Sequence, residues 1–154
     1  MNHKYLILYN PVSCNGRSSK IVEKLKSDFD KLKYSYKYIQ TQYPGHMTEL
    51  CEKNKSYNKV IIIGGDGTFN EAVNGIMLNP LAAQQVFGFL PGGTGNSFLY
   101  DLGGEKYSKA IEIIKKGKIK NIDILKLNLK KSVKYSINIV GWGLVSDVNI
   151  MSEK

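Results

Sequence analysis

The segment at residues 59–71, with the sequence Lys-Val-Ile-Ile-Ile-Gly-Gly-Asp-Gly-Thr-Phe-Asn-Glu, constrains the fold more than any other part of the chain. Its branched apolar run is typical of a strand buried on both faces, which occurs mainly in parallel sheets. Glycines then break the strand, and apolar residues at helical spacing follow: Phe69, Ala72, Val73 and Ile76. The segment therefore predicts a buried parallel strand, a tight turn and a helix with these residues facing inward.

The turn in this segment has the composition of an anion-binding loop. Gly64, Gly65 and Gly67 have no β-carbon, so the backbone can approach a ligand closely. Thr68 lies near the start of the predicted helix, where free backbone N–H groups bind phosphate. The carboxylate of Asp66 repels phosphate unless a divalent cation or a hydroxyl lies between them, so the combination indicates phosphoryl transfer. The plain alternative is an ordinary glycine turn between strand and helix.

Length and composition limit the class of protein. With 154 residues and 42% hydrophobic residues, the chain is long enough for one ordinary globular domain with a core. Its net charge is +9, yet Arg17 is the one arginine among 22 basic residues, which disfavours base recognition and hence a nucleic-acid partner. Two explanations of the lysines remain open: a solvated surface, and attraction to anionic lipid.

The lack of a recognisable targeting signal in this sequence and its cysteine usage lead us to expect a cytoplasmic protein. We expect no transmembrane span, because the sequence has no apolar run of eighteen or more residues, and we see no secretory signal at its start. Cys14 and Cys51 are isolated from each other in the sequence, so we expect two free thiols rather than a disulfide or a metal cluster.

Strands and helices alternate along the first 121 residues, which predicts an α/β domain with a parallel sheet. The other expected strands are residues 5–10, 34–41 and 86–90, and the other expected helices contain residues 21–32, 47–51 and 107–114. The last of these helices ends at Gly117, a favourable cap. The loops after the strands lie at their carboxyl ends, where open α/β sheets bind ligands.

The pattern changes after residue 121. Residues 121–128 and 135–140 alternate between apolar and polar side chains, with a turn at residues 130–132 between them. This predicts a β-hairpin, and hence the beginning of a second, β-rich domain at residues 122–154.

His46 is expected to be a surface histidine at the start of a helix.

Two motifs resemble a known family. The string Gly64-Gly65-Asp66-Gly67-Thr68 resembles a motif of the lipid kinases related to diacylglycerol kinase and sphingosine kinase, which NAD kinase and, more loosely, phosphofructokinase share. The segment around Thr94, Gly95 and Asn96 is similar to one that these lipid kinases have and NAD kinases lack. The chain therefore resembles the diacylglycerol kinase catalytic-domain family. This implies an NAD kinase/diacylglycerol kinase-like (phosphofructokinase-like) α/β fold over residues 1–121.

The resemblance implies the site residues. Asp66 would be the catalytic base, as in the sphingosine kinase branch, or would hold Mg²⁺, and Glu71 would fix the loop. The residues implied to bind ATP come from four loops and one helix start: Asn10, Pro11, Cys14 and Gly16; Thr41; Gly64, Gly65, Asp66, Gly67, Thr68, Asn70 and Glu71; and Gly93, Thr94, Gly95 and Asn96.

The end of the chain resembles sphingosine and ceramide kinases in particular. Trp142 and the residues up to Lys154 are similar to a segment whose aspartate, here Asp147, binds the polar head of a sphingoid base. A carboxylate suits a protonated amine and its hydroxyls. The alternative is a turn or helix-start aspartate beside a core tryptophan.

The expected function is transfer of the γ-phosphoryl group of ATP to a hydroxyl of a lipid at a membrane surface, with a sphingoid base as the first candidate. Diacylglycerol, ceramide and NAD remain alternative acceptors, and a nucleotide-binding module without turnover is the alternative from another class. In the family that the chain resembles, a β-sandwich continues after this point. Because the edges of the hairpin would be unpaired, we expect one of three outcomes: reduced activity, a partner chain or second copy that completes the β-sandwich, or a truncated product that only binds nucleotide.

Overall fold

A computed structural model describes residues 4–13, 16–92, 95–138 and 140 of the chain. Its centre is a sheet of four strands: β1 (Lys4–Tyr9), β2 (Ser35–Gln40), β3 (Lys59–Gly64) and β4 (Val86–Pro91). The strands lie in the order β2-β1-β3-β4 and all pair in parallel. The predicted parallel α/β fold is confirmed.

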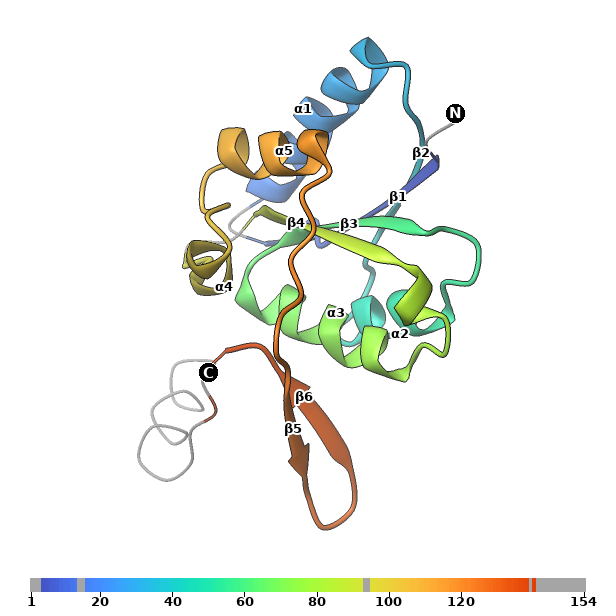
Figure 1. Ribbon diagram of the computed structural model, residues 1–154, viewed down its shortest axis with the longest axis vertical. Coiled ribbons are helices and arrows are strands. Elements are labelled where there is room, and N and C mark those ends of the chain that lie inside the picture. Colours follow the sequence, from blue (N-terminus) through green and yellow to red (C-terminus); the bar gives the residue numbers. More distant parts are fainter. Residues whose placement is uncertain (1–3, 14–15, 93–94, 139, 141–154) are drawn as a thin grey trace.

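Helices cover both faces of the sheet (Figure 1). One face carries α1 (Arg17–Lys31) and α5 (Tyr107–Lys116), and the other carries α2 (His46–Lys53) and α3 (Asp66–Leu78). Helix α2 begins at His46, as predicted, and α5 ends at Gly117, whose φ of 62° fits the expected glycine cap. The short helices η1 (Ala82–Gln84) and α4 (Ser97–Asp101) were not predicted from the sequence.

The two central strands supply the core by alternation. On β1, Leu6 and Leu8 pack toward α2 and α3, whereas Tyr5 and Ile7 pack toward α1 and α5. The run on β3 alternates in the same way, so that it is buried on both faces. The predicted inward face of α3 is buried as well. This doubly covered sheet holds the carboxyl ends of β1 and β3 rigidly side by side.

A hairpin forms a separate small sheet (Figure 1). Its strands β5 (Leu125–Asn128) and β6 (Val133–Ser136) pair antiparallel, and the chain between α5 and β5 crosses from one side of the molecule to the hairpin beside α3. The predicted hairpin is confirmed, but its first strand was placed too early, since β5 starts at Leu125, and its second strand was placed too late. The turn begins one residue earlier, at Leu129, whose N–H donates to the carbonyl of Ser132 at 2.9 Å, so β6 starts at Val133.

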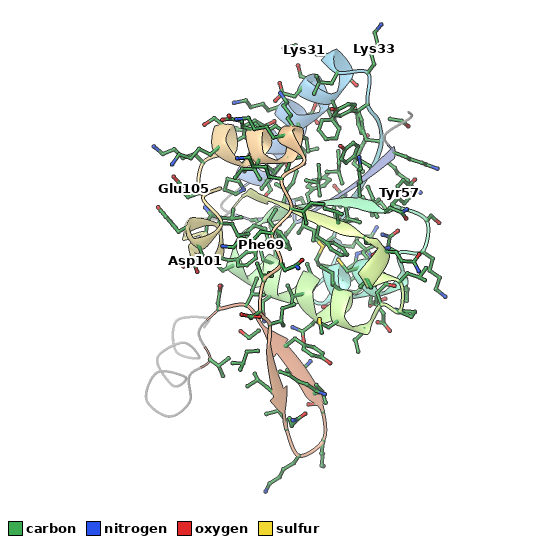
Figure 2. The ribbon with its side chains drawn as sticks, in the orientation of Figure 1. Lys31, Lys33, Tyr57, Phe69, Asp101 and Glu105 are labelled. Atoms are coloured by element: carbon green, nitrogen blue, oxygen red, sulfur yellow. The ribbon has the colours of Figure 1, made fainter. Side chains whose placement is uncertain are left out.

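Lys31, Lys33 and Asp101 are among the side chains that project outward from this framework (Figure 2). Lys31 and Lys33 mark the end of α1, where Lys33 takes a φ of 54° that ends the helix. Among the helices of the described part, none combines the length and the hydropathy that crossing a bilayer requires.

Gly75 sets how closely α2 and α3 approach. A β-carbon there would collide with the backbone carbonyl oxygen of Thr48 and lie 2.9 Å from the Cβ of Cys51. We expect Gly75→Ala to lower the free energy of unfolding by about 1–3 kcal/mol, because overpacking two backbones outweighs the better helix propensity of alanine, about 1 kcal/mol. Urea unfolding measures the change.

The matched control is Gly67→Ala on the same helix, where a β-carbon would meet no atom within 4 Å. It should leave stability unchanged or raise it by up to about 1 kcal/mol. Equal destabilisation by both substitutions would contradict the packing explanation.

Cys51 is a free thiol, as predicted, and is buried between α2 and the sheet. Burial raises the pKa of its thiol to about 12. Because the thiolate is the reactive form, Cys51 should react with a disulfide reagent at pH 8 roughly a hundredfold more slowly in the folded chain than in urea. The measurement uses a Cys14→Ser variant, so that one thiol is counted. Rapid labelling of the folded chain would be incompatible with this burial.

Candidate functional site

The loops that follow the parallel strands meet at one edge of the sheet. Three backbone hydrogen bonds join them: Asn10 N–H to the carbonyl of Ile63 at 3.2 Å, Thr41 N–H to that of Tyr9 at 2.9 Å, and Gly92 N–H to that of Gly64 at 2.6 Å. From β1 the chain passes to β2 on one side, and β3 then pairs on the other. This reversal is the point where open α/β sheets form a ligand-binding crevice.

Thr68 connects the first loop to the glycine turn. Its hydroxyl oxygen accepts a hydrogen bond from Asn10 Nδ2 at 3.4 Å and lies 3.3 Å from Ser13 Oγ, and the residue is buried. The Thr68 side chain also explains Gly64, where a β-carbon would lie 2.5 Å from the Cβ of Thr68. Only a residue without a side chain fits beneath Thr68. The structure thus brings Asn10 together with Gly64 and Thr68.

Asp66 joins the two glycine-containing turns. Its Oδ2 accepts the N–H of Ser97 at 3.1 Å and its Oδ1 accepts the N–H of Phe98 at 3.3 Å. These are the first N–H groups of α4, where a negative charge is favourable. A β-carbon at Gly95 would lie 3.1 Å from Asp66 Oδ2, so the turn passes close to the carboxylate. Asn96, in the left-handed conformation with φ 51°, precedes the helix and is buried.

The motif around Asp66 indicated a chemical role and gave no signal for this capping role. Each carboxylate oxygen has more than one lone pair, so an oxygen that accepts one backbone hydrogen bond can still bind a cation or accept a hydroxyl proton. The contact with α4 therefore orients the carboxylate and leaves it chemically competent.

Glu71 ties α3 to the loop that follows β2. Its Oε1 accepts the N–H of Gly45 at 3.1 Å, and its backbone carbonyl accepts the hydroxyl of Thr48 at 2.9 Å. Gly45 has a φ of 84° and precedes α2, so it needs a backbone that tolerates the left-handed region. Through Glu71, the loop containing Thr41 is fixed relative to the glycine turn.

A hollow with a volume of about 610 Å³ lies beside α3, between the start of α2 and the hairpin. Asn70 and Glu71 line it together with Tyr135 and other hairpin residues. The Oδ1 of Asn70 is buried and has no hydrogen-bond partner among the residues that the structure describes. Such an acceptor is costly to leave unpaired, which fits a donor group of a bound molecule. The volume is in the range of small-molecule sites.

The oxygen ligands of the site also suit an Mg²⁺ ion that is bound together with a nucleotide. The described residues contain no group of three or more histidine, cysteine, aspartate or glutamate residues that could hold a metal on their own. Mg²⁺ in phosphate-transfer sites is usually bound by one or two carboxylates, with phosphate oxygens and waters as its other ligands. Asp66 is placed to supply such a carboxylate.

The remaining predicted residues divide into two sets. Gly16 precedes α1 with a φ of 83°, and Pro11 lies half-buried in the loop with Asn10. Cys14, Gly93, Thr94 and Asp147 lie outside the described residues.

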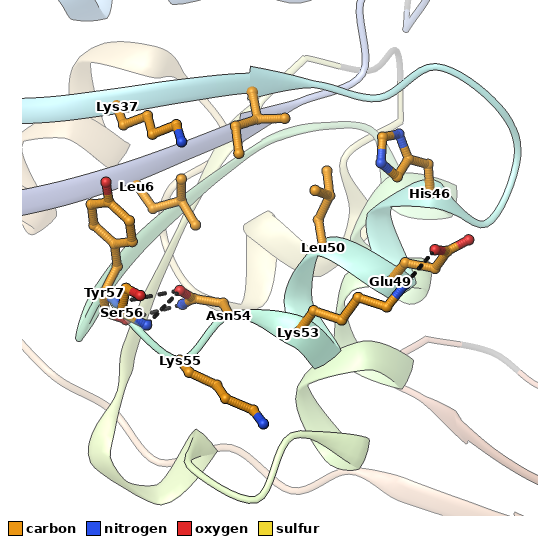
Figure 3. Close-up of a pocket in the computed structure, with 11 residues that line it drawn as sticks. Leu6, Lys37, His46, Glu49, Leu50, Lys53, Asn54, Lys55, Ser56 and Tyr57 are labelled. Carbon is orange, nitrogen blue, oxygen red and sulfur yellow. Dashed lines mark hydrogen bonds and ion pairs between the residues drawn. The ribbon is translucent and has the colours of Figure 1, made fainter.

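A second hollow, of about 320 Å³, lies between β2 and α2 (Figure 3). Several of its polar groups bond to one another: Asn54 Oδ1 accepts the N–H groups of Ser56 and Tyr57, and Lys53 pairs with Glu49 at 2.9 Å. The hydrogen bond from Lys53 lowers the pKa of Glu49. Apart from His46, which stacks on Tyr43, it contains no residue that the motifs singled out. These contacts explain the polar residues of the second hollow by their structural role.

Comparison with known proteins identifies the family. The family described as diacylglycerol kinase catalytic domain matches residues 4–127. The chain is 32% identical over 146 residues to the diacylglycerol kinase of Bacillus subtilis (strain 168), covering 92% of this chain and 46% of the relative. It is 27% identical over 168 residues to sphingosine kinase 1 of Mus musculus, covering 98% of this chain and 44% of the relative.

A solved structure of a diacylglycerol kinase from Bacillus anthracis superimposes with a TM-score of 0.64 at 30% identity, over 79% of this chain and 42% of that one. The chain thus spans less than half the length of each of these three proteins.

The capping role of Asp66 can be measured. Asp66→Ala should expose the N–H groups of Ser97 and Phe98 and speed their hydrogen exchange by roughly tenfold, because a charged acceptor is lost. Asp101→Ala, on the exposed end of the same helix, removes an identical charge and is the control. Unchanged exchange at Ser97 and Phe98 in Asp66→Ala would show that the contact does not hold α4.

Proposed function

Because the chain belongs to the diacylglycerol kinase catalytic domain family, we propose that it forms the nucleotide-binding part of a lipid kinase. The kinase transfers the γ-phosphoryl group of ATP to a lipid hydroxyl. The observation that carries the proposal is the position of Asp66, whose carboxylate contacts the turn after β4 from the turn after β3. A phosphate bound at this edge of the sheet meets both turns and one carboxylate.

Backbone groups bind the phosphates in this proposal. The first N–H groups of a helix have no partners within it, so the start of α3, at Gly67 and Thr68, offers donors to a phosphate. Asn10 and Ser13 contact Thr68 and close the same crevice from the β1 side. Mg²⁺, when bound, would screen the charge of the phosphates next to Asp66.

The chemical step needs little more than positioning. The hydroxyl oxygen of the lipid bonds to the γ-phosphorus while the bond from that phosphorus to the bridging oxygen breaks, and ADP leaves. The hydroxyl proton moves to a carboxylate oxygen of Asp66. Such reactions depend mainly on orientation and on electrostatic stabilisation of the transferred group. Both are supplied by the rigid edge of the doubly covered sheet.

A sphingoid base is the proposed acceptor. The similarity to sphingosine kinase 1 of Mus musculus supports it, as does the chemistry of Asp147, since a carboxylate pairs with the protonated amine of such a lipid. Diacylglycerol is the competing acceptor, because the diacylglycerol kinase of Bacillus subtilis is also similar.

The proposed partners follow from the hairpin and the charge. A second copy or another chain would add strands to the small sheet of β5 and β6, since two strands alone are marginally stable. The net charge of +9, almost all from lysine, favours peripheral contact with an anionic membrane on the cytoplasmic side, where the lipid acceptor is found.

A second candidate function is a nucleotide-binding module without turnover. It rests on the backbone N–H groups at the start of α3, which can bind a phosphate whether or not a transfer follows. Transfer of radiolabel from ATP to sphingosine, ceramide, diacylglycerol and NAD, measured beside ATP affinity by calorimetry, separates the candidates. Label on a lipid supports the kinase, label on NAD alone supports an NAD kinase, and ATP binding without any product supports the module.

Asp66→Asn should reduce lipid phosphorylation by about a hundredfold or more, because the proton acceptor is lost. ATP affinity should change by no more than a few-fold, since the backbone donors remain. Rates and affinities are measured on the same preparation, because the substitution also weakens the cap of α4.

Asp101→Asn is the matched control: the same charge change, on the exposed end of α4. It should keep the wild-type rate. A near wild-type rate in Asp66→Asn would contradict the proposed role of this carboxylate.

A further inference from the structure

Asn74 forms an unusual connection between α3 and the hairpin. Its Nδ2 donates to the carbonyl of Tyr135 at 2.8 Å, and its Oδ1 accepts the N–H of Tyr135 at 3.0 Å. The two residues are 61 positions apart in the sequence. The side-chain amide therefore pairs with both backbone groups of one residue, as a neighbouring β-strand would.

The register of the hairpin explains why Tyr135 is available for this pairing. The Leu129 N–H donates to the carbonyl of Ser132, which makes these two residues a hydrogen-bonded pair. Hydrogen-bonded and non-hydrogen-bonded pairs alternate along an antiparallel hairpin, so the pair of Lys126 and Tyr135 is a non-hydrogen-bonded one. The N–H and C=O of Tyr135 thus point away from β5. They meet the amide of Asn74 instead of a further strand.

The Asn74 amide is also fixed from its own helix. Its Nδ2 donates a second hydrogen bond to the backbone carbonyl of Asn70 at 2.9 Å, one turn earlier. Both hydrogens of Nδ2 are then used, which holds the side chain in one orientation. Asn74 lies on the helix that begins with Asp66, and both Asn70 and Asn74 line the hollow between α3 and the hairpin.

We propose that Asn74 is a positioning residue, which holds the hairpin at a fixed place relative to the turn that carries Asp66. The inference rests on the proposed function and adds that the acceptor lies in the hollow on the side of the hairpin, where the buried Oδ1 of Asn70 has no partner among the described residues. Transfer between two bound groups is sensitive to their alignment, and misplacement by about 1 Å can cost a hundredfold in rate. An amide paired to Tyr135 is a short and rigid link for this purpose.

Hydrogen exchange of the Tyr135 amide tests the link without reference to activity. In Asn74→Ala both hydrogen bonds are lost, and exchange at Tyr135 should become about tenfold faster. Asn74→Asp keeps nearly the same volume and an acceptor for the Tyr135 N–H but loses the donor to its carbonyl, so exchange should be intermediate. Asn128→Ala, at an exposed asparagine of the hairpin itself, is the matched control and should leave exchange at Tyr135 unchanged.

Kinetics then separate positioning from a merely structural role. In Asn74→Ala the lipid-dependent kcat should fall by about tenfold to a hundredfold, while the KM for ATP and the ATP affinity stay within about twofold. Unchanged exchange at Tyr135 would overturn the link. A parallel loss of ATP affinity and kcat would overturn the positioning role.

If the wild-type chain phosphorylates no lipid, the proposed function fails. The exchange at Tyr135 in the three variants still decides whether Asn74 holds the hairpin. The two failures are therefore distinguishable in one set of preparations.

Discussion

The contact between the Asp66 carboxylate and the first N–H groups of α4 is the interaction on which the rest of the site depends. It joins loops that follow two adjacent strands, and it works only because both loops approach closely. Gly64 leaves room for Thr68, and Gly95 leaves room for the carboxylate. The parallel register of β3 and β4, which ends with Gly64 opposite Pro91, brings the two loops to the same level.

Helix α3 extends this arrangement to the rest of the molecule. It begins at Asp66, and its successive polar residues face different neighbours: Glu71 bonds to the N-terminus of α2, and Asn74 bonds to the hairpin. Its apolar residues pack against the sheet. A ligand held at the first turn of α3 therefore contacts an element that fixes the other parts of the site, which is the geometric requirement of phosphoryl transfer.

Elements whose formation depends on neighbouring residues could be predicted from the sequence pattern. The branched run on β3, the helical spacing on α3 and the glycine cap of α5 were each readable from neighbouring residues, and the structure confirms them. Helix α4 was missed because it has five residues, too few for a periodic pattern, and its cap comes from Asp66, 31 positions away. Asn74 gave no signal for a related reason, since its partner Tyr135 is remote in sequence and becomes a neighbour only through the fold.

In the proposed function, the terminal phosphates of ATP bind between the two glycine turns. Titrating ATP and Mg²⁺ into the ¹⁵N-labelled chain and following its amide resonances tests this most directly. We expect the largest changes to fall on Gly67, Thr68, Gly95 and Asn96 together, from both turns. Changes confined to the lysine-lined hollow beside β2, with both turns unaffected, would contradict it.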